Sequence, residues 1–566
     1  MVSQVSLTCA ILGGFIVIYG LVSGFVKQRL YLSEAFIATA VGIAFGPLGA
    51  NWFSPSSFGN EEAITREFAR LCIAIQVMAA GVALPKAYLW KEIRSLTILL
   101  IPGMIWMWLS SSLLVWWLIP GLNFLESLMI ASCFTPTDPV LASSIVQGHF
   151  AEQHVPFHIR NLILAESGAN DGLGYPFLFL AVYLLQMPTG QAIGKWFYWI
   201  LAFQILLSTI IGFVVGFIAR KALKFAEQRK MIDKESFLVY AVALAVSGCG
   251  RLFLTGTVSI IGSDDLLACF IAGNSFTWDD WFRIETENAH MAEVVDVLLN
   301  LSMFVYIGAT VPWDSFTDSS LSLSLWRLFV LAILVLLLRR LPIVLATYKF
   351  APAIHNFREA LFTGWFGPIG VGALFYYTVA IEQFAVDGPD AHARSVVKPI
   401  VYFMILASVL VHGNTIPMFY LGSFASRTIT RTSFSSSGTN SVSRLPKLSF
   451  GTDIFSRHSK GKSNVSATRD GVPVAREGID VPLDVSHPPK QTAITIITPD
   501  NIRTKPNMTH SESAPSFSSS TLAQNKNAEA SSSRLVTEQS DRDENQLAGM
   551  AHSPGRTSSE SLDDII

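Results

Sequence analysis

Charged side chains are scarce in this sequence. Asp, Glu, Lys and Arg make up 14% of its 566 residues, whereas 51% are hydrophobic. A typical soluble domain carries about 25% charged residues, so the composition argues against a large soluble enzyme and indicates a membrane protein. The 40 basic and 42 acidic side chains nearly cancel, with a formal net charge of -2. That balance provides no basic surface for nucleic acid, and no such partner is expected.

Cysteine is scarce as well. The five cysteines lie in or beside apolar stretches, and no two of them have the spacing of metal ligands. This argues against a disulfide framework and a zinc fold, and it favours small buried side chains. No resident cofactor is expected.

Long apolar runs are abundant up to about residue 423. A membrane-spanning helix needs about 20 apolar residues, and about 13 such spans are predicted, with 12 left open. They fall at roughly 5–26, 30–49, 69–85, 96–118, 127–147, 159–186, 198–219, 236–252, 256–276, 294–311, 325–348, 359–382 and 396–422. The expected fold class is therefore an all-α polytopic membrane protein, with a transmembrane domain over residues 1–423.

The remaining residues, 424–566, are rich in Ser and Thr and poor in aromatic side chains. Such a segment cannot bury enough apolar surface to offset the entropy of ordering, so it is predicted to be a disordered tail. The tail is a candidate binding region for regulatory proteins or kinases.

Basic residues predict the orientation of the spans. Six lysines and arginines gather in the loop at 220–235, which should be cytoplasmic. Alternating the spans from there places the loops that hold Lys86 and Lys349, and the tail, inside. The acidic loops that hold Glu61 and Asp314 fall outside.

The predicted fifth span contains Thr135-Pro136-Thr137-Asp138-Pro139-Val140. Two prolines one helical turn apart interrupt backbone hydrogen bonding there. The break exposes carbonyls and amides beside Thr137 and Asp138, and transporters coordinate cations at such unwound helices. The alternative is a structural kink in which Asp138 caps the following half-helix.

The predicted sixth span contains Glu166-Ser167-Gly168-Ala169-Asn170-Asp171-Gly172. Glu166 and Asn170 are four residues apart and share a helix face, while Asp171 points about 100° further round. Ionisable groups inside spans are costly and usually functional. A purely structural buried network is the alternative.

Arg339 and Arg340 lie inside the predicted eleventh span. An unpaired arginine would be costly at that depth, so one of them is expected to pair with Glu166. Both could instead snorkel to the interface. The next span contains Gly364-Trp365-Phe366-Gly367-Pro368-Ile369-Gly370, a second broken-helix signature, for which a simple packing kink is the alternative.

Two further polar groups stay ambiguous. Asp264 and Asp265 are candidates for an ion passage, but Ser263 at an N-cap with acids in the first turn is also ordinary helix initiation. His149, His154 and His158 gather in one predicted cytoplasmic loop, where a solvated loop is favoured over a pH sensor.

Together these motifs resemble the monovalent cation/proton antiporter family 1. The resemblance rests on Thr137-Asp138-Pro139-Val140 with Glu166-Ser167-x-x-Asn170-Asp171. The longer strings TPTDPVLAS, ESGANDGLGYPF, SDDLLACFIAGNSFTWDDWF and GWFGPIGVGA resemble the fungal plasma-membrane sodium/proton antiporters of that family. The similarity covers roughly residues 1–423.

The resemblance implies a homodimer in which a core domain moves, as an elevator, against a dimerisation domain. It also implies that the broken fifth and twelfth helices cross at the site. The cation-binding residues that it implies are Asp171, which also binds the proton, and Asp138, Thr137 and Ser167.

The resemblance implies supporting roles for the neighbouring residues. Asn170 would help orient Glu166, and Glu166 would pair with Arg340 or, as second choice, Arg339. The Asn170-Asp171 pair is similar to the electroneutral branch of the family. Asp264 and Asp265 could supply extra charge, so the number of protons per cation stays open.

The implied activity is export of cytoplasmic Na⁺, and also Li⁺, in exchange for H⁺ at the plasma membrane, with K⁺ left open. Its implied role is salt tolerance and cation and pH homeostasis. One carboxylate would hold either a cation or a proton, never both, as the site faces each side in turn.

Two other functions fit the sequence less well. An intramembrane aspartyl protease needs a Gly-x-Gly-Asp setting, whereas the order here is the reverse, Asp171-Gly172-Leu173-Gly174, so no enzymatic activity is expected. A passive channel fits the broken helices, but buried carboxylates paired with arginine suit a coupled carrier better.

Overall fold

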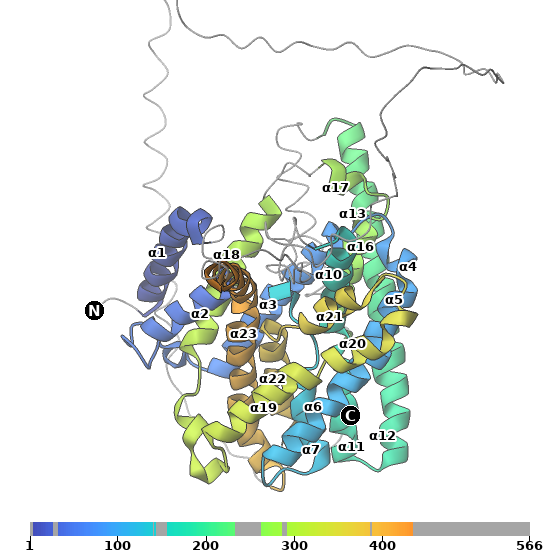
Figure 1. The fold of residues 1–566 in the computed structure, drawn as a ribbon. Coiled ribbons are helices and arrows are strands. Elements are labelled where there is room, and N and C mark those ends of the chain that lie inside the picture. Colours follow the sequence, from blue (N-terminus) through green and yellow to red (C-terminus); the bar gives the residue numbers. More distant parts are fainter. Residues whose placement is uncertain are drawn as a thin grey trace, which may run out of the picture. The chain divides into compact units, whose positions relative to one another are not determined.

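A computed structural model describes residues 4–26, 32–139, 141–142, 155–231, 262–285, 291–384 and 388–433. These residues form helices and connecting segments, with no strand among them, as Figure 1 shows. The all-α fold class is therefore confirmed. The residues of the predicted tail beyond Ser433 lie outside the described part of the chain.

The helices of the described residues follow one another along the chain. In order they are α1 (Gln4–Phe25), α2 (Glu34–Phe45), α3 (Glu61–Ala83), α4 (Tyr88–Lys91), α5 (Ile93–Ile98), α6 (Met104–Leu118), α7 (Phe124–Cys133), α10 (Phe157–Gly172), α11 (Gly174–Gln186), α12 (Thr189–Lys195), α13 (Leu207–Gln228), α16 (Asp265–Phe276), α17 (Trp281–Glu285), α18 (Met291–Ala309), α19 (Leu325–Leu338), α20 (Leu341–Thr347), α21 (Phe357–Trp365), α22 (Val371–Gln383) and α23 (Ala391–Ser433).

Five helical stretches of the described residues are both long enough and apolar enough to cross a membrane. They are Ser6–Gly24, Ile93–Leu118, Thr189–Gln228, Leu325–Phe350 and Ala391–Thr415, and four shorter apolar helices accompany them. Each of the five overlaps a predicted span. The predicted span at 236–252 lies outside the described residues, so the total of 12 or 13 stays a prediction.

Four predicted spans are divided in the structure, and one of them, 325–348, divides into α19 and α20 around Arg339 and Arg340. The span at 127–147 stops being helical after Cys133, and the span at 359–382 divides into α21 and α22. Prolines and glycines explain both breaks, as expected from the sequence. The division of 159–186 at Leu173, between α10 and α11, was not expected. Pro176 follows in the first turn of α11, where a residue without a backbone N–H is tolerated because that group would have no partner within the helix.

Six contacts join helix ends in pairs, and the predicted alternation of spans divides these pairs into two groups. In the first group, Lys224 Nζ lies 2.6 Å from Asp279 Oδ2, the Tyr88 hydroxyl 3.4 Å from the His158 carbonyl, and the Ala353 amide 3.0 Å from Ser95 Oγ.

In the second group, Lys398 Nζ lies 2.7 Å from Glu61 Oε1, His392 Nε2 3.1 Å from the Pro120 carbonyl, and Gln186 Nε2 3.4 Å from the Gln383 carbonyl. Each contact joins two segments that the predicted alternation places on the same side of the membrane. Which side faces the cytoplasm stays a prediction.

Small residues allow two helices to pack backbone against backbone. Gly212 and Gly216 of α13, in a small-xxx-small pattern, face α16. A Cβ atom at either position would overlap the carbonyl oxygen of Ala268 or Ala272. Helices in a membrane associate through such close contacts because lipid provides no hydrophobic drive between them. The α13–α16 contact therefore fixes the helix that begins with Asp265.

We expect Gly212→Ala to destabilise the protein. In an open helix the change would stabilise by about 0.5–1 kcal/mol, but here the new methyl group collides with the backbone of α16, and overpacking costs about 1–3 kcal/mol. The measurement is the thermal unfolding midpoint in detergent. Gly20→Ala in α1, where a Cβ meets no atom within 4 Å, is the matched control. An unchanged or higher midpoint for Gly212→Ala would contradict this packing.

Candidate functional site

The site lies where two broken helices cross. After α7 the chain is unwound to Asp138, and between α21 and α22 it is unwound over Phe366–Gly370. Figure 1 shows α7 low and α21 higher in the view, so the two half-helices approach from opposite ends. The Asp138 amide donates to the Pro368 carbonyl at 2.9 Å. The two breaks are thus hydrogen-bonded to each other.

Asp138 caps two half-helices at once. Its Oδ2 atom accepts from the Leu141 amide and its Oδ1 atom accepts from the Val371 amide, both at 2.8 Å. Its side chain is 2% exposed. Helix N-termini carry partial positive charge, so two of them stabilise the buried carboxylate. Asp138 therefore caps the half-helix that follows it, which was the alternative to cation binding, and it also caps α22. Its role as a cation ligand stays a prediction.

Arg339 joins the carbonyl ends of both breaks. Its guanidinium donates to the carbonyls of Phe134 and Gly367, and lies 3.4 Å from the carbonyl oxygen of Pro136. The side chain is 1% exposed, which rules out snorkelling. Helix C-terminal ends carry partial negative charge and leave carbonyls unpaired. Arg339 satisfies them at the ends of α7 and α21.

Arg340 forms the buried ion pair. Its guanidinium binds both carboxylate oxygens of Glu166, with Nη2 to Oε2 at 2.6 Å. Its Nε atom donates to the Thr363 carbonyl at 2.9 Å. Arg340 is therefore the partner of Glu166, ahead of Arg339. The pair ties α10 to the segment between α19 and α20.

Asn170 differs from its expected role. Its Oδ1 atom accepts from the Thr137 amide at 3.2 Å, and its Nδ2 atom donates to Thr137 Oγ1 at 2.7 Å. These bonds go to the first break and not to Glu166. Thr137 Oγ1 also lies 3.1 Å from Ser167 Oγ. The unwound segment exposes backbone groups that a side-chain amide can satisfy, so Asn170 anchors Thr137 to α10 beside Ser167.

Asp171 also lies at the crossing, but its carboxylate has no hydrogen-bond partner among the described residues. Its side chain is fully buried, and both carboxylate oxygens lack a hydrogen-bond partner among the described residues. The Tyr376 hydroxyl donates to its backbone carbonyl, not to the carboxylate. A buried charge without compensation is costly. The carboxylate therefore requires a proton or a cation.

The glycines of the second break leave room for these charged groups. A Cβ atom at Gly370 would lie 2.5 Å from Asp138 Cγ, and one at Gly372 would lie 2.5 Å from Asp171 Oδ1. A Cβ atom at Gly367 would overlap the side chain of Arg340. The GWFGPIGVGA string is therefore more than a packing kink, because its small residues bring α22 against both carboxylates.

Two residues that hold the crossing in place could not be identified from the sequence. Ser408 of α23 accepts from the Ile369 amide of the second break at 2.7 Å, and Tyr376 of α22 bonds to the Asp171 backbone. Each is an ordinary side chain within an apolar helix. Only the folded arrangement brings them to the crossing.

Asp264 and Asp265 lie on a cavity of about 240 Å³ rather than at the crossing. Asp265 Oδ2 accepts from Arg70 Nε at 2.7 Å. The cavity is also lined by Tyr175, whose ring centroid is 5.5 Å from that of Tyr376. Tyr376 in turn donates its hydroxyl to the Asp171 backbone carbonyl, so ring contacts connect the wall of this cavity with the crossing. A role of the two acids in ion passage stays a prediction.

The cap of α16 differs from the expected one. Asp264 itself is the N-cap, and its Oδ1 atom accepts from the Leu267 amide at 3.1 Å. Ser263 donates instead to the carbonyls of Phe203 and Gln204. An aspartate and a serine cap equally well, and the neighbouring carbonyls decide between them here.

Comparison with known proteins identifies the family. The profile of the family described as "Sodium/hydrogen exchanger, transmembrane" matches residues 14–421. The chain belongs to the sodium/hydrogen exchanger family. This is a family of transporters and not of enzymes.

The chain is similar to several yeast proteins. It is 47% identical to a probable Na⁺/H⁺ antiporter of Schizosaccharomyces pombe, over 74% of this chain and 57% of that protein. It is 40% identical to a Na⁺/H⁺ antiporter of Saccharomyces cerevisiae, over 81% of this chain and 48% of that protein. The chain thus spans about half the length of these two relatives. A second Schizosaccharomyces pombe Na⁺/H⁺ antiporter, 35% identical, is covered over 90% of its length.

A solved structure shares the fold of this chain. The sodium proton antiporter MjNhaP1 from Methanocaldococcus jannaschii, at pH 8, aligns with a TM-score of 0.55 and 16% identity. The alignment covers 73% of this chain and all of that one. At this identity the likeness concerns the fold alone.

We expect Arg339→Met to lower the thermal unfolding midpoint strongly. The carbonyls of Phe134 and Gly367 would lose their donor, and a buried unpaired carbonyl costs about 1–3 kcal/mol. Arg327→Met, which removes a donor to the Ser322 carbonyl at the start of the same helix, is the control and should cost less. Equal losses in the two variants would show that Arg339 does not hold the breaks together.

We expect Glu166 and Arg340 to be strongly coupled. Glu166→Leu or Arg340→Met alone leaves a buried unpaired charge and should cost about 3–5 kcal/mol. The double variant removes both charges and should lose less stability than either single variant. A double-mutant cycle on thermal unfolding measures the coupling. Additive losses would mean that the ion pair contributes nothing beyond its separate side chains.

Proposed function

We propose that this exchanger is a secondary active antiporter that moves Na⁺ out of the cytoplasm in exchange for H⁺. The family and the printed names of its relatives, which are Na⁺/H⁺ antiporters, support this activity. Alternating access exposes Asp171 to each side of the membrane in turn.

One observation carries the proposal: the Asp171 carboxylate is fully buried and has no hydrogen-bond partner among the described residues. The neighbouring charges are compensated within the protein, since Glu166 binds Arg340 and Asp138 caps two helices. A carboxylate that must be neutralised by a mobile ion binds a proton or an alkali ion. Because it carries one negative charge, the two ions compete, and that competition couples their movements.

The surrounding oxygens suit an alkali cation. Thr137 Oγ1 and Ser167 Oγ lie 3.1 Å apart beside the first break, and Asp138 lies against the same break. Oxygen ligands suit hard cations, and unwound helices provide such ligands in transporters. We assign Thr137, Ser167 and Asp138 to the cation shell of Asp171.

The exchanger carries one proton for each cation in this scheme. Asn170 occupies the place where a second acid would add charge, and its amide is bonded to Thr137. Asp265 is paired with Arg70 outside the crossing. The titratable charge at the crossing therefore changes by one during exchange.

The resemblance to fungal antiporters supports proposals for the transported ions, the oligomeric state, the membrane and the physiological role. The transported ions are Na⁺ and Li⁺, with K⁺ to be tested beside them. The protein acts as a homodimer in the plasma membrane, in salt tolerance and in cation and pH homeostasis. The basic loop at 220–235 and the tail at 424–566 face the cytoplasm, where the tail binds regulatory proteins or kinases.

We expect Asp171→Asn to abolish exchange. An amide cannot take up a proton or neutralise a cation, so neither ion would be carried. The measurement is Na⁺-driven proton flux in proteoliposomes, repeated with Li⁺ and K⁺ and with the voltage clamped by an ionophore. Asp314→Asn, which neutralises an exposed acid in the segment after α18, is the control and should transport normally.

Retained Na⁺-dependent proton flux in Asp171→Asn would exclude this carboxylate as the shared site. Currents far above the turnover of a carrier, without coupling to pH, would favour a passive channel. A flux that charges the membrane would contradict one-for-one exchange.

A further inference from the structure

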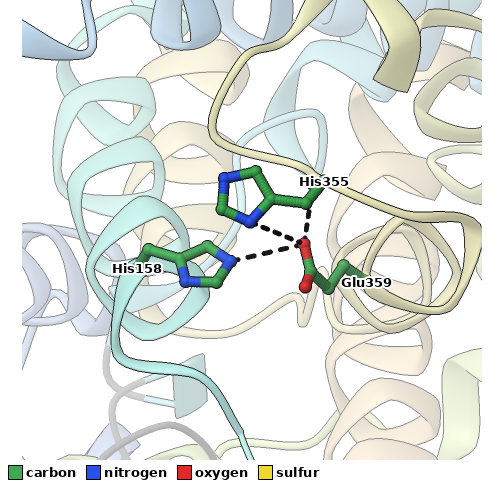
Figure 2. A group of neighbouring side chains, drawn as sticks. All are labelled: His158, His355 and Glu359. Carbon is green, nitrogen blue, oxygen red and sulfur yellow. Dashed lines mark hydrogen bonds and ion pairs between the residues drawn. The ribbon is translucent and has the colours of Figure 1, made fainter. Parts of the chain in front are cut away.

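A second polar cluster lies away from the ion crossing, at the ends of two helices. His158 is in the first turn of α10, and His355 and Glu359 flank the start of α21. Figure 2 shows both imidazole rings facing the Glu359 carboxylate. His158 Nε2 lies 3.3 Å from Glu359 Oε2, and His355 Nδ1 lies 3.9 Å from the same atom. The sequence grouped His158 with His149 and His154, which lie outside the described residues.

The spacing of these atoms suits a transition metal. Zinc bonds of about 2.0–2.1 Å at a tetrahedral angle separate ligand atoms by about 3.3–3.4 Å. The three candidate ligand atoms lie within 4.8 Å of one another, so small side-chain rotations would bring them to an ion. Two imidazoles and one carboxylate are the ligand set of several zinc sites that keep a fourth position open.

Burial and bonding leave the ligand atoms available. The Nε2 atom of His158 is buried and makes no hydrogen bond among the described residues. Glu359 is 4% exposed, and its oxygens accept from the His355 amide at 2.7 Å and from Asn356 Nδ2 at 2.8 Å. A carboxylate offers about four acceptor positions, so capacity for a metal remains.

Helix capping alone does not account for the cluster. The amide of His355 and the side chain of Asn356 already explain why Glu359 lies at the start of α21. Neither contact needs an imidazole ring. The two rings nevertheless converge on one carboxylate, with centroids 4.4 Å apart, from segments far apart in sequence.

We propose that His158, His355 and Glu359 bind a divalent transition-metal ion of the Zn²⁺ class. His158 Nε2, His355 Nδ1 and Glu359 Oε2 are the ligands, and solvent completes the coordination. The His355 side chain is 60% exposed, which gives the ion access. The bound metal links α10, which carries Glu166 and Asp171, to α21, which leads into the second break.

Metal binding by the full-length protein tests this site directly. Zn²⁺ is titrated in competition with a chromophoric chelator, after removal of any histidine tag, and Co²⁺ is used as a spectroscopic probe. We expect His355→Ala and His158→Gln to weaken Zn²⁺ binding at this site at least tenfold, since even outer-shell changes at metal sites cost 10- to 100-fold in affinity. Zn²⁺ should raise the thermal unfolding midpoint of the unmodified protein by mass action.

His392→Ala is the matched control, because it removes a histidine at the other group of helix ends. It should retain Zn²⁺ affinity and the rise in unfolding midpoint, whereas both cluster variants should lose them. His355 is exposed, so its variant should fold. Equal Zn²⁺ affinity and equal midpoint shifts in the unmodified protein and His355→Ala would overturn the proposal. These readouts do not depend on transport.

Discussion

The fold depends on hydrogen-bond partners for the backbone N–H and C=O groups that two broken helices expose in the apolar core of the membrane. No water from bulk solvent pairs with such groups at that depth, and each unpaired group costs several kcal/mol. The protein meets this demand with two opposite charges. Asp138 accepts amides at the starts of two half-helices, and Arg339 donates to carbonyls at the ends of two others. The amides at the helix starts thus stabilise the Asp138 carboxylate, and the carbonyls stabilise the Arg339 guanidinium. In return, the two side chains supply the hydrogen-bond partners that these backbone groups lack.

This arrangement sets Asp171 apart from its neighbours. Glu166 has the Arg340 guanidinium, and Asp138 has two helix starts. The glycines at 370 and 372 bring α22 against Asp138 and Asp171, and the Asp171 carboxylate gains no donor from that approach. The crossing is therefore held together by charges that are already compensated. In the proposed mechanism, Asp171 could then exchange a proton for a cation without breaking the bonds that hold the half-helices.

Local signals made much of this site predictable. Pro136, Pro139 and Pro368 marked the breaks, and the cost of buried charge pointed to the pairing of Glu166 with an arginine. The contacts of Arg339 and Asn170 were not predictable, because both bind groups of an unwound segment whose path depends on tertiary packing. Likewise the sequence predicted a solvated loop at His158. Its spatial neighbours His355 and Glu359 lie almost two hundred positions later, so the cluster could not be predicted.

The charge inventory also bears on stoichiometry. A second titratable acid beside Asp171 would let the site release two protons for one cation and so move net charge. The neighbouring position is Asn170, whose amide uses both its donor and its acceptor side on Thr137. At the start of α16, Asp265 is paired with Arg70, and Asp264 caps the helix through its Oδ1 atom, while its buried Oδ2 atom makes no hydrogen bond among the described residues. An amide that anchors the first break thus stands beside Asp171 where a second acid would add charge, and this supports the proposed exchange of one proton for one cation.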